Sequence, residues 1–176
     1  MNPEETSGSN RMAKRRLIAA AAMAVGLFGM ATSAPAFAQY RQEIRNDMGQ
    51  CEAGAGPAVM VTVSGIKAGK GTLRIQSYKA NAAEWLAKGK WLSRMELPAR
   101  AGTMTVCVPV SGPGTYGIAI RHDLNGNGDT DIRTDGGGMS NNPAINIFNL
   151  GKPSYTKVGV PVGDGVKSIR IQMKYM

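Results

Sequence analysis

The sequence predicts an all-β protein, an antiparallel β-sandwich of about seven strands. Branched apolar residues recur at every second position along several stretches, most clearly where Val59, Val61 and Val63 alternate with Met60 and Thr62. A period of two places one face of each stretch in a core. Short turns rich in glycine and proline separate these stretches, which is typical of antiparallel strands. Aromatic residues make up only 6% of the chain, so the core is expected to consist mainly of Val, Ile, Leu and Met.

The alternation also locates the individual strands. Turns are expected at Lys67–Gly71 and at Ser111–Gly114, because glycine and proline interrupt the pattern there. The strands themselves are expected at residues 59–63, 73–78, 104–110, 116–120, 158–162 and 169–175. Strands of this number and spacing indicate a sandwich of the immunoglobulin-like or transthyretin-like kind.

One segment between the second and third of these strands breaks the period of two. Asn81 is a suitable helix N-cap, Glu84 follows three residues later, and Gly89 can end a helix. Residues 81–89 are therefore expected to form a short helix or a helical loop.

Residues 1–38 are predicted to be a leader and a signal peptide. Basic residues at Met12–Arg16 precede an apolar run at Leu17–Met30 and the small-residue end Ala36-Phe37-Ala38. Cleavage after Ala38 is favoured over a membrane anchor, so no membrane span is expected afterwards. The sequence leaves open whether Met1 or Met12 is the true start. Residues 39–56 are expected to be irregular, residues 57–176 to form the β-sandwich, and the protein to be periplasmic or extracellular.

The charge of the chain is basic but not patterned. The chain has 21 basic and 12 acidic residues, and removing the four basic and two acidic residues of the leader leaves a net charge of +7. These basic residues form no run, and export argues against a nucleic-acid partner. The expected partner is an unknown ligand or a component of the cell envelope, and the protein is expected to be a monomer.

Two cysteines, Cys51 and Cys107, are expected to form a disulfide, because the protein is predicted to be exported. Cys107 has the opposite parity to the apolar Val106 and Val108. Its side chain should lie on the outer face of its strand, where the irregular segment that carries Cys51 can cross it. Two free thiols or a metal pair fit an oxidising compartment less well.

The stretch from Asp123 to Asp131 is a candidate calcium loop. Calcium takes six to eight oxygen ligands at about 2.3–2.6 Å, and glycines let a short loop turn tightly around it. The loop is not an EF-hand, because Thr134 stands where the bidentate glutamate would be. The alternative is a hydrogen-bonded Asx turn without an ion. The candidate ligands are Asp123, Asn125, Asn127, Asp129 and Asp131.

His122 shares its parity with Tyr116, Ile118 and Ile120, so its side chain is expected to point towards the core. Adjacent residues on a strand point to opposite faces, so His122 and Asp123 do not form a catalytic dyad by adjacency. The expected partner of the imidazole is a loop carbonyl or the turn at Ser140 and Asn141.

The segments Gly114–Gly128 and Gly138–Asn142 resemble the exported bacterial family catalogued as domain of unknown function 2141. The resemblance covers roughly residues 57–176 and implies one β-sandwich behind a signal peptide, with no activity assigned. The residues that carry it are Tyr116, His122, Asp123, Asn125, Asn127, Gly128, Ser140 and Asn141.

Two functions from different classes follow. The first is an exported non-enzymatic β-sandwich of the cell envelope, an accessory or binding module that a structural calcium ion could stabilise. The alternative is a hydrolase that uses His122 with Ser140 or with a metal-bound water. A structure in which His122 lies within about 3.5 Å of the Ser140 hydroxyl in an open pocket would favour the enzyme.

Overall fold

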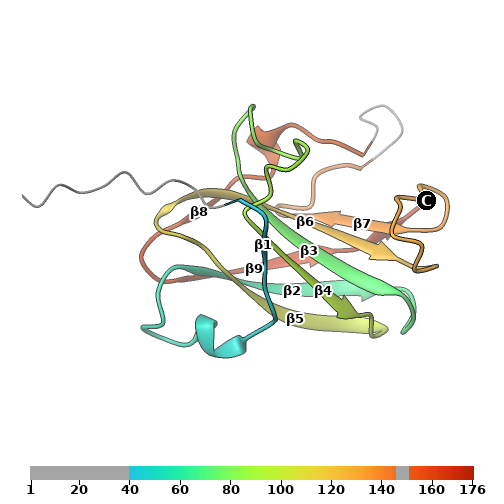
Figure 1. The fold of residues 1–176 in the computed structure, drawn as a ribbon, viewed down its shortest axis with the longest axis horizontal. Coiled ribbons are helices and arrows are strands. Elements are labelled where there is room, and N and C mark those ends of the chain that lie inside the picture. Colours follow the sequence, from blue (N-terminus) through green and yellow to red (C-terminus); the bar gives the residue numbers. More distant parts are fainter. Residues whose placement is uncertain (1–39, 146–150) are drawn as a thin grey trace, which may run out of the picture. The chain divides into compact units, whose positions relative to one another are not determined.

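A computed structural model describes residues 40–145 and 151–176, and these residues form two β-sheets (Figure 1). The all-β prediction is confirmed. Within the described residues there is no α-helix, only the two 3₁₀ turns η1 (Met48–Cys51) and η3 (Tyr155–Lys157). The same residues contain no helix with the length and apolar character that a membrane crossing needs. The predicted signal peptide, residues 1–38, and the question of the true start lie outside the described residues.

The strands divide into a larger and a smaller sheet. Neighbours in the larger sheet follow the order β1-β4-β3-β6-β7-β10, with β8 also paired to β6, and the smaller sheet has the order β5-β2-β9. The strands are β1 (Gln42–Glu43), β2 (Ala58–Ile66), β3 (Thr72–Lys79), β4 (Ser93–Pro98), β5 (Gly102–Pro109), β6 (Gly114–Asp123), β7 (Gly136–Met139), β8 (Val160–Val162), β9 (Val166–Gln172) and β10 (Lys174–Tyr175).

Most strand pairs are antiparallel, as expected, but two are parallel. β1 runs parallel to β4, and β9 runs parallel to β2 over the whole register from Ala58↔Val166 to Ser64↔Gln172. The second pair arises because the chain passes from β8 in the larger sheet to β9 in the smaller one. β2 therefore lies between an antiparallel neighbour, β5, and a parallel one.

The core lies between the two sheets and consists mainly of branched aliphatic side chains. Val59, Val61 and Val63 are fully buried on one face of β2, as their alternation predicts. Other buried members of the same core are Leu73, Ile75, Met95, Val106, Val108, Ile118, Ile120, Val160, Val162 and Ile171. Burying one such side chain stabilises the fold by about 1.5–3 kcal/mol.

Three of the strands, β1, β4 and β7, were not predicted. β7 reads Gly-Gly-Gly-Met and has no apolar alternation. Close packing requires two of its glycines, because a Cβ at Gly138 would lie 2.8 Å from Ile171 and one at Gly136 would overlap the ring of Tyr175. The small residues thus allow the chain around β9 and β10 to approach β7.

Residues 81–89 form a helical loop and not a helix. The N-cap forms as predicted, because the Asn81 side-chain oxygen accepts from the backbone N–H groups of Ala83 and Glu84 at 3.0 and 2.9 Å. Trp85 then packs over Gly117, and its indole N–H donates to the Pro153 carbonyl at 2.9 Å. These contacts hold the segment against the larger sheet, and the chain leaves it through Gly89 with φ at 74°.

The predicted disulfide is present. Cys51 and Cys107 are bonded, with their Cα atoms 5.8 Å apart. The segment that carries Cys51 follows β1, and the side-chain oxygen of Asn46 accepts from the Cys107 N–H at 2.9 Å. The N-terminal segment therefore pairs with β4 of the larger sheet and is fixed to β5 of the smaller one.

Candidate functional site

Tyr116 is a structural residue at the start of β6. Its hydroxyl donates to the Gly112 carbonyl at 2.7 Å and accepts from the Lys79 ammonium at 2.8 Å. A buried tyrosine that bonds to the backbone a few residues upstream is the tyrosine corner of many β-sandwiches. Tyr116 therefore fixes the turn between β5 and β6.

His122 is fully buried and joins three separate segments, as its inward parity predicts. Its Nε2 lies 2.8 Å from the Lys70 carbonyl, and its Nδ1 lies 2.7 Å from the Tyr175 hydroxyl. Tyr175 also accepts from the Lys67 N–H at 3.0 Å. Because a carbonyl can only accept, Nε2 carries the proton and the Tyr175 hydroxyl donates to Nδ1. Burial raises the pKa of Tyr175, which keeps this donor protonated.

The turn that follows β7 is also structural. The Ser140 hydroxyl donates to the Val158 carbonyl at 2.6 Å and accepts from the Ile118 N–H at 3.0 Å. Asn142 accepts from the Gln172 N–H at 2.7 Å through its side chain. Asn141 and Asn142 both have positive φ, at 61° and 50°, which asparagine tolerates better than most residues. The turn thereby satisfies backbone groups of β6, β9 and the chain before β8.

His122 and Ser140 do not form the pair that a serine hydrolase needs. Both ring nitrogens of His122 face Tyr175 and Lys70, and the Ser140 hydroxyl bonds to backbone groups on β6 and beside β8. Both side chains are fully buried, so neither opens onto a pocket. The histidine has the loop-carbonyl partner that its position predicted.

Asp123 organises the loop that follows β6. Its two carboxylate oxygens accept from the backbone N–H groups of Gly126 and Gly128, at 2.7 and 2.8 Å. Both glycines have positive φ, at 74° and 83°. Asn125 and Asn127 each accept from a backbone N–H two residues on, as in an Asx turn.

Arg121 supplies positive charge to this loop. Its guanidinium donates to the Gly128 carbonyl and to the Thr130 hydroxyl, both at 2.7 Å, and lies 3.6 Å from the Asp123 carboxylate. Asp135 closes the far side of the loop by accepting from the Leu124 and Asp131 N–H groups, both at 3.1 Å. The loop is thus held by its own hydrogen bonds and by one arginine.

The predicted calcium ligands lie in one loop, but several of them are hydrogen-bonded to one another. The side-chain NH₂ groups of Asn125 and Asn127 both donate to the Asp131 carboxylate, at 2.8 and 2.9 Å. Among the residues that the structure describes, no three His, Cys, Asp or Glu side chains form a metal-holding group. The hydrogen bonds are those of an Asx turn, and calcium binding stays a prediction.

The environment of Asp123 makes the stability of the loop depend on pH. Burial alone would raise its pKa, but the N–H groups of Gly128 and Gly126, together with Arg121, outweigh burial and lower the pKa below its ordinary value of 3.8. A lowered pKa contributes stability that is fully present above the ordinary value and is lost as pH falls through the folded-state value.

We therefore expect Asp123→Asn to destabilise the protein at neutral pH, and the difference from the wild type to shrink as pH falls below 3.8. Urea unfolding at a series of pH values measures this, with the exposed Asp164→Asn as the control. A constant difference across that range would contradict the role of the ionised carboxylate.

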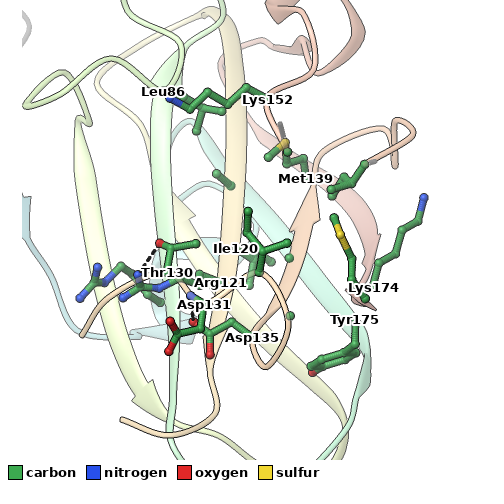
Figure 2. A pocket seen from close by; sticks show the side chains of 18 of the residues that line it. Leu86, Ile120, Arg121, Thr130, Asp131, Asp135, Met139, Lys152, Lys174 and Tyr175 are labelled. Carbon is green, nitrogen blue, oxygen red and sulfur yellow. Dashed lines mark hydrogen bonds between the residues drawn. The ribbon is translucent and has the colours of Figure 1, made fainter. Parts of the chain in front are cut away.

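A groove crosses the outer face of the larger sheet beside this loop. It consists of two adjoining hollows of about 850 and 480 Å³, which share Gln76 and Leu86, and we call it the outer groove. Ala119 and Arg121 of β6 form part of the floor of the larger hollow, on the face opposite to the buried Ile118 and Ile120. Figure 2 shows that Asp131 and Asp135 lie at one end of the larger hollow and Lys152 at the other.

The fold and the motif residues define a disulfide-bonded β-sandwich with a structural Tyr–His–Asp–Ser motif. Residues 61–170 match the model of a family described as uncharacterized protein conserved in bacteria (DUF2141). This match spans more than half of the chain, and the protein therefore belongs to this bacterial family. Comparisons with curated proteins and with solved structures give no significant match.

Several residues of the site were not singled out from the sequence. Arg121 and Tyr175 act through partners that are distant in sequence or on another strand. Asn142 belongs to the motif segment Gly138–Asn142, but the sequence pattern predicts no role for its side chain. Of these residues, only Arg121 could have been recognised from the sequence. It directly precedes the His-Asp pair, and its parity places its side chain on the outer face of the strand.

Proposed function

We propose that this protein is an exported β-sandwich of the cell envelope that acts as a binding module, with the outer groove as its ligand site. The observation that carries the proposal is the groove itself. Sites for small molecules are concave, mostly apolar and about 300–1,000 Å³ in volume, and the larger hollow has about 850 Å³. The motif residues contribute indirectly, because their hydrogen bonds fix the strands and the loop that form the walls of the groove.

The groove also has the layout of a rigid site. Its floor is formed by β3, β6 and β7, which are bonded side by side in the larger sheet, and the hydrogen-bonded Asx loop forms one wall. A site on paired strands is pre-formed, so little conformational entropy is lost when a ligand binds.

Native mass spectrometry of the protein isolated from the periplasm tests the proposal. We expect a co-purified small molecule on the wild type and its loss in Ala119→Trp, which fills the groove from the middle of β6. Thr62→Trp, on the outer face of the central strand of the smaller sheet, is the matched control and should keep the molecule. A wild type without any bound molecule, or an equal load on Ala119→Trp, would count against the groove.

Export is tested by the N-terminus of the mature protein. We expect Gln39 to be the first residue of the exported chain, because Ala36-Phe37-Ala38 is the preferred cleavage signal. Intact-mass measurement of periplasmic protein gives the answer, and a chain that retains the segment from Met12 to Ala38 would be inconsistent with it.

A structural calcium ion in the Asx loop would require Asn125 and Asn127 to turn their carbonyl oxygens towards Asp131. Binding to the folded state alone would add about 2.7 kcal/mol at a hundredfold excess over Kd. We expect calcium to raise the melting temperature more than magnesium does, and Asp123→Ala to abolish the rise. Identical melts with calcium and with chelator would leave an Asx turn without an ion.

A further inference from the structure

We infer that the outer groove binds a single-chain amphiphile with an anionic head, a carboxylate or phosphate on an apolar chain, and that the head lies at the Leu86 end. The inference rests on the proposed binding function and adds the chemistry of the ligand. Three features of the groove lead to it. They are the basic side chains without a carboxylate partner, the exposed apolar surface, and the position of the acidic side chains at one end.

The positive charge of the domain is concentrated along the groove. Seven of the seventeen basic residues after Ala38 line the two hollows, whereas only two of the ten acidic residues do, Asp131 and Asp135. Arg74 and Arg121 are paired with carboxylates. Within the described residues, the other five basic side chains of the groove have no carboxylate partner. An anionic group would therefore find cations that the protein does not neutralise itself.

The larger hollow also exposes apolar surface. Ala119 and Met139 lie on its sheet side, and Ile132 and Met176 lie on its rim with 56% and 55% of their surface exposed. These are two of the four large hydrophobic residues that are exposed in the described part of the chain. Apolar surface gathered in one hollow is typical of a binding site and indicates an apolar body in the ligand.

The acidic side chains of the groove lie at one end, where Arg121 accompanies them, and the other end carries basic side chains only. Asp131 and Asp135 lie at one end of the larger hollow, and Lys152 lies near Leu86 at the other (Figure 2). Leu86 also lines the second hollow, together with Lys88 and Arg94. A polymer with negative charges along its whole length would meet the two aspartates. One anionic head at the Leu86 end, with its apolar chain over Ala119 and Met139, avoids them.

Isothermal titration calorimetry with three ligands that share a dodecyl chain tests the inference. Dodecanoate is anionic, dodecyl maltoside is neutral and dodecyltrimethylammonium is cationic, each used below its critical micelle concentration. We expect dodecanoate to bind at least about tenfold more tightly than the other two, because close charge pairs contribute on this scale. The preference should weaken at high salt.

The location of the head is tested by charge reversal. Lys88 and Lys152 are exposed, so Lys88→Glu/Lys152→Glu should fold normally. It should weaken dodecanoate binding by about tenfold or more and leave dodecyl maltoside unchanged. Lys157→Glu/Lys167→Glu makes the same change in net charge outside the groove and should leave both unchanged. Ala119→Trp should remove binding of all three.

Equal binding of the three ligands, or an equal loss in the control pair, would overturn the inference. So would binding to vesicles of anionic phospholipid without binding of monomeric dodecanoate, because the ligand would then be a membrane surface. A co-purified molecule that Ala119→Trp removes, combined with no affinity for dodecanoate, would leave the binding function standing and reject only the anionic amphiphile.

Discussion

Removal of the Cys51–Cys107 disulfide is expected to lower the free energy of unfolding by about 2–5 kcal/mol. The bond closes a loop of 56 residues, and in the chain-entropy account such a loop restricts the unfolded chain by roughly 4 kcal/mol. A second contribution comes from the folded state. The bond holds the N-terminal segment against β5, where Asn46 accepts from the Cys107 N–H.

The measurement is urea unfolding of the wild type, with and without reductant, and of Cys51→Ala/Cys107→Ala. Reductant should destabilise the wild type to the level of the double variant and should not affect the double variant itself. If the reduced wild type and the double variant were as stable as the oxidised wild type, the disulfide would not contribute to holding the N-terminal segment. Spectra of the folded forms should stay those of a β-protein, because neither sulfur lies between the sheets.

Substitution of His122 is expected to have a comparable effect. His122→Ala should lower the free energy of unfolding by about 3–5 kcal/mol, because it leaves a cavity in a fully buried position and removes two hydrogen bonds. The Lys70 carbonyl would lose its donor, and the Tyr175 hydroxyl would lose its acceptor and keep only the bond from the Lys67 N–H. The turn before β3 and strand β10 would then be released from the end of β6.

Tyr175→Phe separates the two parts of this effect. It removes only the hydroxyl and should cost about 1–2 kcal/mol, and the double variant should cost less than the sum because both residues share one bond. Equilibrium unfolding of the four proteins gives the coupling energy. Additive losses would contradict the network. A role of His122 in catalysis alone would predict no loss of stability in any of them.

The sequence predicted those features that depend on local pattern. The period of two located β2, β3, β5 and β6, and the parity of single residues placed His122 inside and Cys107 outside. Because the side chains of a strand alternate strictly between its two faces, one reliable apolar position determines the direction of the others. The turn at Lys67–Gly71 and the N-cap at Asn81 were predicted for the same reason, since both depend on neighbouring residues.

Features that depend on distant segments could not be predicted. β7 consists of three glycines and a methionine, and it is a strand only because β6 and β10 lie on either side of it. The outer groove combines residues from five strands with the segments around Leu86 and Lys152. No single stretch of sequence carries its signal. The pattern of Asp, Asn and Gly located the loop after β6, but it gave no sign that Arg121 donates to Gly128 and Thr130 across that loop.

The parallel pairing of β2 with β9 determines the order in which the domain can assemble. The paired residues, such as Ala58 and Val166, lie about a hundred residues apart in the chain. The centre of the smaller sheet therefore stays open on one side until the last part of the chain arrives, and closing so long a loop makes folding slow. We expect pulsed hydrogen exchange to show the β2–β9 amides protected last. On the proposed route of export, a chain of this topology cannot fold completely before its C-terminal strands have crossed the membrane.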